Sequence, residues 1–214
     1  MDGTGILFSL LIDLLPAFVQ AKIVTYSTAE KQTYDELIQE IKLKLPVVPF
    51  ILLAESFAGP IAHELSLDKN IPIEKVILVA SFLSSPRPKL SGIAELAPLK
   101  IFLSLQMPRA FIRYFCFGQY VDNKLVSLFR KAIERVDKGV LTFRLLQIAR
   151  LKAPENISNT TCINFIATND KLVPRRVGKK IENHFDQVTT IELEVPHFLA
   201  QTNNSQIILS IIQG

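Results

Sequence analysis

The sequence predicts an α/β protein: a mostly parallel sheet with helices on both faces and a helical insertion above the carboxyl ends of the strands. Short apolar runs alternate along the chain with segments in which apolar residues recur at helical spacing. The short runs are apolar throughout, which is typical of strands buried on both faces of a parallel sheet. The expected strands are residues 22–26, 50–54, 75–81, 162–168 and 188–194.

Helices are expected before and between these strands. Residues 5–17 are apolar, but Asp13 interrupts them and Asp2 stands where a secretory signal would carry basic residues, so a buried helix is expected. Residues 34–42 and 57–67 place apolar side chains at helical spacing. No run reaches the roughly 18 apolar residues of a membrane-spanning helix.

The pattern changes between residues 84 and 152. Pro86 and Pro88 break the chain, and the following segment has helical spacing and many aromatic residues. Neighbouring parallel strands need only a short connection, so a segment of this length predicts a helical cap insertion. The remaining residues, 1–83 and 153–214, are expected to form the α/β core.

The positive charge is concentrated in the predicted cap. The whole chain has a net charge of +4, whereas residues 100–152 contain eleven Lys and Arg against three Asp and Glu, a net +8. Basic residues scattered along helices usually form a solvated face. The alternative is a surface that binds anionic ligands or a membrane; no nucleic-acid partner is expected.

The two cysteines, Cys116 and Cys162, lie in apolar surroundings. This placement favours neither a disulfide framework nor a zinc site. A reducing, cytoplasmic location fits best, and neither a metal nor a cofactor is expected.

Ser56 has the surroundings of an activated serine. It follows an apolar strand and precedes a helical segment, and a sharp strand-to-helix turn exposes a serine hydroxyl at the top of a sheet. Such a turn needs small side chains two residues to either side, and Ala54 and Ala58 meet that need. The usual motif has glycine at both places, so an ordinary turn with a capping serine is the competing interpretation.

A nucleophilic serine needs a base, and the chain has three histidines. His63 lies two turns along the helix that follows Ser56, and His184 lies at an expected helix end. His197, in contrast, follows the last expected strand, where ligands bind in open α/β sheets. Asp170 follows the preceding strand and could orient His197.

With these residues the chain resembles the α/β-hydrolase superfamily, and in particular its small bacterial esterase-like members. The order Ser56, Asp170, His197 is the order of nucleophile, acid and base in that superfamily. The resemblance rests on four segments: residues 2–5, 54–60, 169–174 and 196–198. It implies that Ser56 is the nucleophile, Asp170 the acid and His197 the base, and that the backbone N–H of Phe57 supplies half of an oxyanion hole.

The Asp2–Gly5 segment also permits other interpretations. Phosphatases of the haloacid dehalogenase type and actin-like kinases use similar glycine-containing turns. Neither class accounts for Ser56, Asp170 and His197 together.

The first residues depart from the resembled family. Members have strands before the residue 2–5 loop, and alignment with them makes Met1 the second oxyanion donor. The strand that directly precedes this loop would lie between residues 22–26 and 50–54. If Met1 is the true start, the sheet is expected to lack a central strand. Three explanations stay open: the sequence is a fragment or a mis-started gene product, the sheet closes over the gap, or the protein is a degenerate non-enzyme. The 214-residue chain is expected to be poorly soluble and to have little or no esterase activity.

The predicted function is hydrolysis of carboxylic ester or thioester bonds through an acyl-enzyme. The aromatic cap suggests an apolar acyl group on a small substrate. Two alternatives stay open: a weak or inactive hydrolase-fold protein that binds a ligand or partner through the basic cap, and an acyltransferase with the same three residues.

Overall fold

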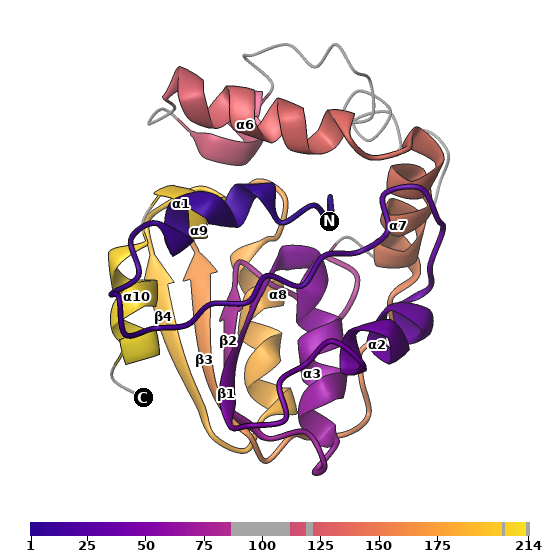
Figure 1. The fold of residues 1–214 in the computed structure, drawn as a ribbon, viewed down its shortest axis with the longest axis vertical. Coiled ribbons are helices and arrows are strands. Elements are labelled where there is room, and N and C mark those ends of the chain that lie inside the picture. The colour runs from indigo at the N-terminus through magenta and orange to yellow at the C-terminus, as the bar shows by residue number, and fades with distance from the viewer. Residues whose placement is uncertain (87–111, 119–121, 203, 213–214) are drawn as a thin grey trace.

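A computed structural model describes residues 1–86, 112–118, 122–202 and 204–212 of the chain. Four parallel strands form one sheet in the order β1-β2-β3-β4, as the apolar runs predict (Figure 1). The strands are β1 (Phe50–Glu55), β2 (Ile73–Val79), β3 (Thr161–Ala167) and β4 (Val188–Leu193). Because all four point the same way, the loops that follow them gather at one edge of the sheet.

Helices cover both faces of the sheet, as expected for a parallel sheet with apolar strands. One face packs against α3 (Gly59–Leu67) and η5 (Lys180–His184) through Ala62 and Ile181. The other face packs against α1 (Ser9–Ile12), α9 (Leu199–Thr202) and α10 (Ser205–Ile212) through Leu11, Leu199 and Ile207. Helix α8 (Arg175–Lys179) packs against β3.

Three of the helices begin at residues whose side chains accept hydrogen bonds from the backbone N–H groups of the first turn, which have no partner within the helix. Helix α2 (Tyr34–Lys42) starts with a capping box, in which the Thr33 side chain and the Glu36 side chain each accept the other residue's backbone N–H. In the described part of residues 84–152, Asp122 caps α6 (Asn123–Glu134) and Asp137 caps α7 (Lys138–Arg150). A π-helical turn, η4 (Arg113–Phe117), precedes them.

The described part of the predicted cap is thus helical. Helices α6 and α7 and the η4 turn share an apolar cluster with the N-terminal 3-10 turn η1 (Ile6–Phe8). The division into a core and a cap at residues 84 and 152 stays a prediction, and residues 87–111 lie outside the described part.

Two expectations for the N-terminal third are wrong. The helix expected over residues 5–17 ends at Ile12, after η1 and the short α1. Residues 22–26 form no strand; they belong to an irregular segment, residues 19–26, which we call the strap. The strap crosses beside β1 on its way to α2 (Figure 1). The sequence of the strap favours a strand, but a strand also needs a neighbour to pair with, and Tyr26 N–H instead bonds Gly3 O at 2.9 Å.

Within the described residues, no helix is both long and apolar enough to cross a membrane.

Candidate active site

Ser56 lies at the sharp turn between β1 and the short 3-10 turn η2 (Ser56–Ala58), which leads into α3. Its backbone φ is 53°, in the left-handed region that non-glycine residues rarely adopt. The Ser81 hydroxyl donates a hydrogen bond to the Ser56 carbonyl at 2.9 Å and so supports this strained turn. The turn therefore holds the Ser56 side chain out above the carboxyl end of the sheet.

Close packing explains why the turn needs small residues. A Cβ atom added to Gly59 would lie 2.4 Å from Ser81 Oγ and 3.0 Å from the Phe82 carbonyl oxygen. Ala54, on the β1 side of the turn, is buried. The start of α3 can thus approach the end of β2 only because the residue at 59 has no side chain.

Two hydrogen bonds join the three residues singled out from the sequence. His197 Nε2 lies 3.0 Å from Ser56 Oγ, and His197 Nδ1 lies 2.6 Å from Asp170 Oδ2. Asp170 follows β3 and His197 follows β4, so the parallel sheet brings all three residues to one edge. The structure therefore places the three side chains in one continuous chain of hydrogen bonds.

The Asp170 side chain is itself fixed in position. Asp170 Oδ1 accepts the backbone N–H groups of Leu172 and Val173 at 2.7 and 2.9 Å. Its other oxygen is free to face His197, and only 1% of its side chain is exposed. The loop after β3 thus orients Asp170 before any substrate is present.

The charges around His197 favour its protonated form. Burial by itself would lower the pKa of His197, but the charge of Asp170, the hydrogen bond to it and the charge of Glu55 together raise the pKa above its ordinary value of 6.5. The raised pKa makes His197 a stronger base toward the hydroxyl of Ser56 than an ordinary histidine.

No family model matches this sequence, and no curated protein matches it. Solved structures do resemble it. A hydrolase from Oleispira antarctica superposes with a TM-score of 0.77 at 11% identity, over 100% of this chain and 88% of the other. An esterase from Exiguobacterium antarcticum superposes with a TM-score of 0.71 at 14% identity, over 97% and 85%. An α/β hydrolase from a deep-sea metagenome library of the Medee basin gives 0.66 at 12% identity, over 91% and 75%.

The chain has the α/β-hydrolase fold. At identities this low, the similarity establishes only the fold. The chemistry has to be argued from the residues of the site.

In this α/β-hydrolase fold, the other two histidines lie away from Ser56. His63 is buried in α3, and its Nε2 lies 3.2 Å from the backbone oxygen of His184. This agrees with the sequence-based choice of His197. In the described ranges, no group of three or more His, Cys, Asp or Glu side chains is arranged to hold a metal ion.

The residues assigned to the oxyanion hole occupy different environments. Phe57 directly follows Ser56, and its ring is fully buried and stacked on Tyr34, with centroids 4.8 Å apart. Met1 lines the same cavity as Ser56 and His197, and burial lowers the pKa of its α-amino group. The roles of Phe57 and Met1 as oxyanion donors stay a prediction.

Arg144 holds the N-terminal segment in place, which the sequence did not indicate. This residue of α7 is fully buried, and it donates hydrogen bonds to the carbonyl oxygens of Met1, Asp2 and Ser27 at 2.9, 3.0 and 2.7 Å. Its guanidinium also lies 5.6 Å from the centre of the Tyr26 ring. Arg144 is one of the eleven basic residues counted in 100–152, but its charge lies in the interior. Binding of anions or membranes by the remaining basic residues stays a prediction.

A second carboxylate, Glu55, lies beside the three-residue chain. Burial raises the pKa of Glu55, although a hydrogen bond from Gln201 Nε2 at 3.0 Å acts in the opposite direction. Gln201 belongs to α9, which starts two residues after His197. The Glu55–Gln201 bond therefore ties the strand that carries Ser56 to the helix behind His197. Sequence reasoning missed this bond because Glu55 occupies a variable position of the motif around Ser56 and Gln201 lies 146 positions farther along the chain.

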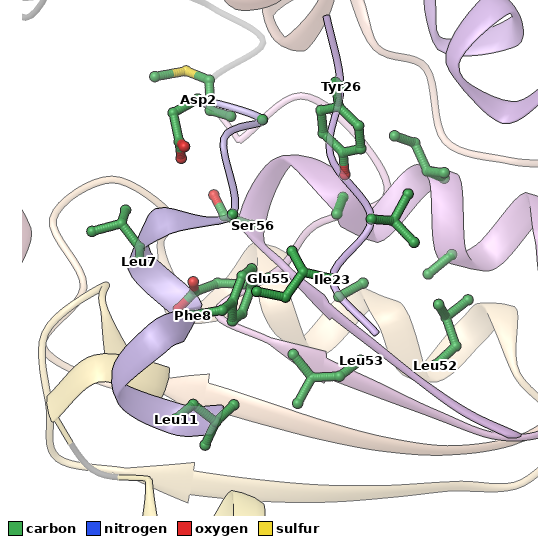
Figure 2. Close-up of a pocket in the computed structure, with 18 of the residues that line it drawn as sticks. Asp2, Leu7, Phe8, Leu11, Ile23, Tyr26, Leu52, Leu53, Glu55 and Ser56 are labelled. Atoms are coloured by element: carbon green, nitrogen blue, oxygen red, sulfur yellow. The ribbon is translucent and has the colours of Figure 1, made fainter. Parts of the chain in front are cut away.

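The site opens into a cavity of about 870 Å³. Figure 2 shows Ser56 at one part of its wall, Leu52 and Leu53 farther along β1, and Ile23 and Tyr26 on the strap. The lining is mainly apolar, with Glu55, Ser56 and His197 supplying polar groups near the hydrogen-bond chain. Ligand sites in proteins usually combine an apolar lining with a few placed polar groups in this way.

Proposed function

We propose that this chain is a serine hydrolase that cleaves carboxylic ester or thioester bonds through an acyl-enzyme. The observation that carries the proposal is the hydrogen-bond chain from Ser56 through His197 to Asp170, with Ser56 on a left-handed turn at the end of β1. A hydroxyl, a base and an orienting acid in this order are the parts that nucleophilic acyl transfer needs.

In the first half-reaction, Ser56 Oγ attacks the carbonyl carbon of the substrate and His197 Nε2 takes the hydroxyl proton. Asp170 holds the imidazole in the required tautomer and stabilises the imidazolium. His197 then gives the proton to the leaving alcohol or thiol, which departs as the carbon–oxygen or carbon–sulfur bond breaks. In the second half-reaction, His197 takes a proton from water as the water oxygen attacks the acyl carbon. His197 then returns this proton to Ser56 Oγ as the bond between Ser56 and the acyl group breaks, which releases the carboxylic acid and restores the Ser56 hydroxyl.

Negative charge develops on the substrate carbonyl oxygen during both steps and needs N–H donors nearby. The backbone N–H of Phe57 is the proposed first donor, because it belongs to the residue after the nucleophile. The N-terminal group of Met1 is the proposed second donor, supported by its place on the same cavity wall.

The substrate is proposed to be a small molecule with an apolar acyl group. Apolar side chains, among them Leu172 and Phe198, line the cavity together with Ser56 and His197. Two structures that superpose on this chain are a hydrolase and an esterase, and an ester substrate agrees with that similarity.

Covalent labelling tests this proposal directly. A fluorophosphonate probe should modify the wild-type protein at Ser56, which peptide mass spectrometry identifies, and should not modify Ser56→Ala. His197→Ala should be labelled far more slowly because the hydroxyl loses its base. Ser205→Ala and His184→Ala are the matched controls, because both residues lie outside the cavity lining, and both should be labelled like wild type.

The same experiment separates the alternatives. Equal labelling of wild type and Ser56→Ala would place the nucleophile elsewhere and refute the proposal. If Ser56 is labelled, p-nitrophenyl acetate should give a stoichiometric release of nitrophenol followed by turnover. Turnover that depends on an added alcohol or thiol instead of water would identify an acyltransferase, and no release at all would identify a binding protein.

A further inference from the structure

Glu55 directly precedes Ser56 at the end of β1 (Figure 2). Successive side chains of a strand alternate between the two faces of a sheet. Ile51 and Leu53 pack into the cluster that α1, α9 and α10 share with the sheet, so Glu55, two residues farther along, lies on the same face. Its carboxyl group therefore lies on the α9 side of the sheet.

The carboxyl group of Glu55 is bonded to the helix that follows His197. Glu55 Oε2 accepts a hydrogen bond from Gln201 Nε2 at 3.0 Å, and the Gln201 side chain is buried. Helix α9 begins at Leu199, two residues after His197. His197 therefore lies on a short connection between two fixed points: the end of β4, and a helix that is bonded to the residue beside Ser56.

Glu55 also acts on His197 through its charge. Burial raises the pKa of Glu55, and among the described residues its Oε1 has no hydrogen-bond partner. The bond from Gln201, a positive charge on His197 and the backbone N–H of Ala200 act in the opposite direction and favour the carboxylate. Because coupling between two charges is reciprocal, an ionised Glu55 favours the imidazolium form of His197 to the same extent.

In the proposed reaction, positive charge develops on His197 as it takes the Ser56 proton. Asp170 contacts the imidazole at Nδ1, and Glu55 supplies a second negative charge from a different element. A group whose interaction strengthens as charge develops in the transition state accelerates the reaction. The structure thus gives Glu55 two ways to act on the base: through the bond to α9 and through its charge.

We propose that Glu55 is a positioning residue for His197: it fastens α9 to the end of β1, which holds the imidazole at the Ser56 hydroxyl, and its negative charge stabilises the imidazolium that forms during attack. This inference rests on the proposed hydrolase function and adds to it a residue outside the chain of Ser56, His197 and Asp170.

The other charged groups around the pair stay constant in the tests. Among the described residues, the charged groups that act on His197 are Asp170, Glu55 and the α-amino group of Met1, which opposes protonation of the imidazole. Those that act on Glu55 are His197 and the same amino group. Because Asp170 and Met1 are unchanged in every variant below, a difference from wild type reports the contribution of Glu55 or Gln201.

Glu55→Gln tests the role of the charge. Glutamine keeps the size of the side chain and an oxygen that accepts from Gln201, but it carries no negative charge. The pH midpoint of Ser56 labelling by the fluorophosphonate should fall by about half a unit or more, because His197 loses a charge that favours its protonation. Glu64→Gln is the matched control, since Glu64 is exposed on α3 and does not line the cavity, and its midpoint should equal that of wild type. A side chain with a merely structural role would leave the midpoint unchanged, and that result for Glu55→Gln would overturn the proposal.

Gln201→Leu tests the role of the bond to α9. Leucine removes the donor and keeps an apolar side chain in the buried position. Labelling of Ser56 above the pH midpoint should slow about tenfold, because small displacements of a reacting group have large effects on rate. Gln206→Leu is the matched control, since Gln206 is exposed on α10, and it should be labelled like wild type. The double variant Glu55→Gln with Gln201→Glu exchanges acceptor and donor and should recover part of the lost rate. Labelling of Gln201→Leu at the wild-type rate would contradict the positioning role.

The outcomes separate this inference from the proposed function. If wild type is not labelled at Ser56, the proposed hydrolase itself fails. If wild type is labelled at Ser56 but Glu55→Gln keeps the wild-type midpoint, only the role of Glu55 fails. Urea denaturation shows whether each variant is folded. If Gln201→Leu does not fold, the midpoint of Glu55→Gln still decides the question, because glutamine has nearly the same shape as glutamate.

Discussion

Replacing Arg144 with methionine should destabilise the protein and loosen the N-terminal segment. Arg144 donates three hydrogen bonds to backbone carbonyls from a fully buried position. At about 1.5 kcal/mol for each bond to a charged donor, the lost bonds amount to roughly 4.5 kcal/mol. Burial of the Arg144 charge is unfavourable, because it lowers the pKa of Arg144 in the native protein. Methionine carries no charge and avoids this cost, which offsets part of the loss. We therefore expect a net loss of about 3 kcal/mol in the free energy of unfolding.

Urea denaturation measures this loss. With a denaturant dependence of about 2 kcal/mol/M, the midpoint should fall by about 1.5 M. Arg150→Met is the control, because Arg150 is exposed at the end of the same helix, and its midpoint should barely change. Labelling of Ser56 should also slow in Arg144→Met, since Met1 and Asp2 line the cavity beside Ser56. Equal midpoints for the two variants would show that Arg144 does not anchor the segment.

Three further outcomes are expected. Asp170→Asn should slow labelling of Ser56 by up to about 10⁴-fold, because the amide favours the wrong tautomer of His197; a rate within tenfold of wild type would contradict the role of Asp170. The rate in wild type should rise with pH through a midpoint above 6.5, because the pKa of His197 is raised and only the neutral form accepts a proton; a midpoint below 6.5 would show the opposite shift. Gly59→Ala should cost about 1–3 kcal/mol in the free energy of unfolding, measured by urea denaturation, because its Cβ would overlap Ser81 Oγ, and Ser81→Ala in the same chain should restore part of the loss.

The raised pKa of Glu55 predicts how the stability of the protein depends on pH. Burial raises the pKa of Glu55 above its ordinary value of 4.5, so the folded state favours the protonated carboxyl. The contribution of Glu55 to stability is then complete below pH 4.5 and is lost as the pH rises through its raised value. In Glu55→Gln, the urea midpoint should therefore fall less between pH 4 and pH 7 than in wild type. An equal fall in the two proteins would show that Glu55 does not contribute to the pH dependence of stability.

The residues around Ser56 show what sequence reasoning can reach. The order of Ser56, Asp170 and His197, each after an apolar run, was enough to predict that the three side chains meet, because parallel strands deliver their following loops to one edge. The strands β1 to β4 were found for a related reason, since buried parallel strands are apolar along their whole length.

Other features depend on partners that are distant in the sequence. Residues 22–26 have the composition of a strand, but within the described part of the chain no strand pairs with them, and pairing is a property of two segments. Arg144 could not be distinguished from the ten other basic residues in 100–152, because its three carbonyl acceptors lie more than 110 positions away. Glu55 and Gln201 are likewise joined only by the fold.

The loop that carries His197 is fastened to the predicted cap as well as to the sheet. Phe198 N–H donates to the Cys116 carbonyl at 3.3 Å, and the Phe198 ring packs against Phe117 and Phe129, with centroids 4.7 and 5.3 Å away. The imidazole of His197 in turn meets the Phe198 ring edge to face at 5.2 Å. Under the proposed mechanism, a substrate that displaced η4 or α6 would therefore also shift His197, so the size of the substrate would affect the position of the proposed base.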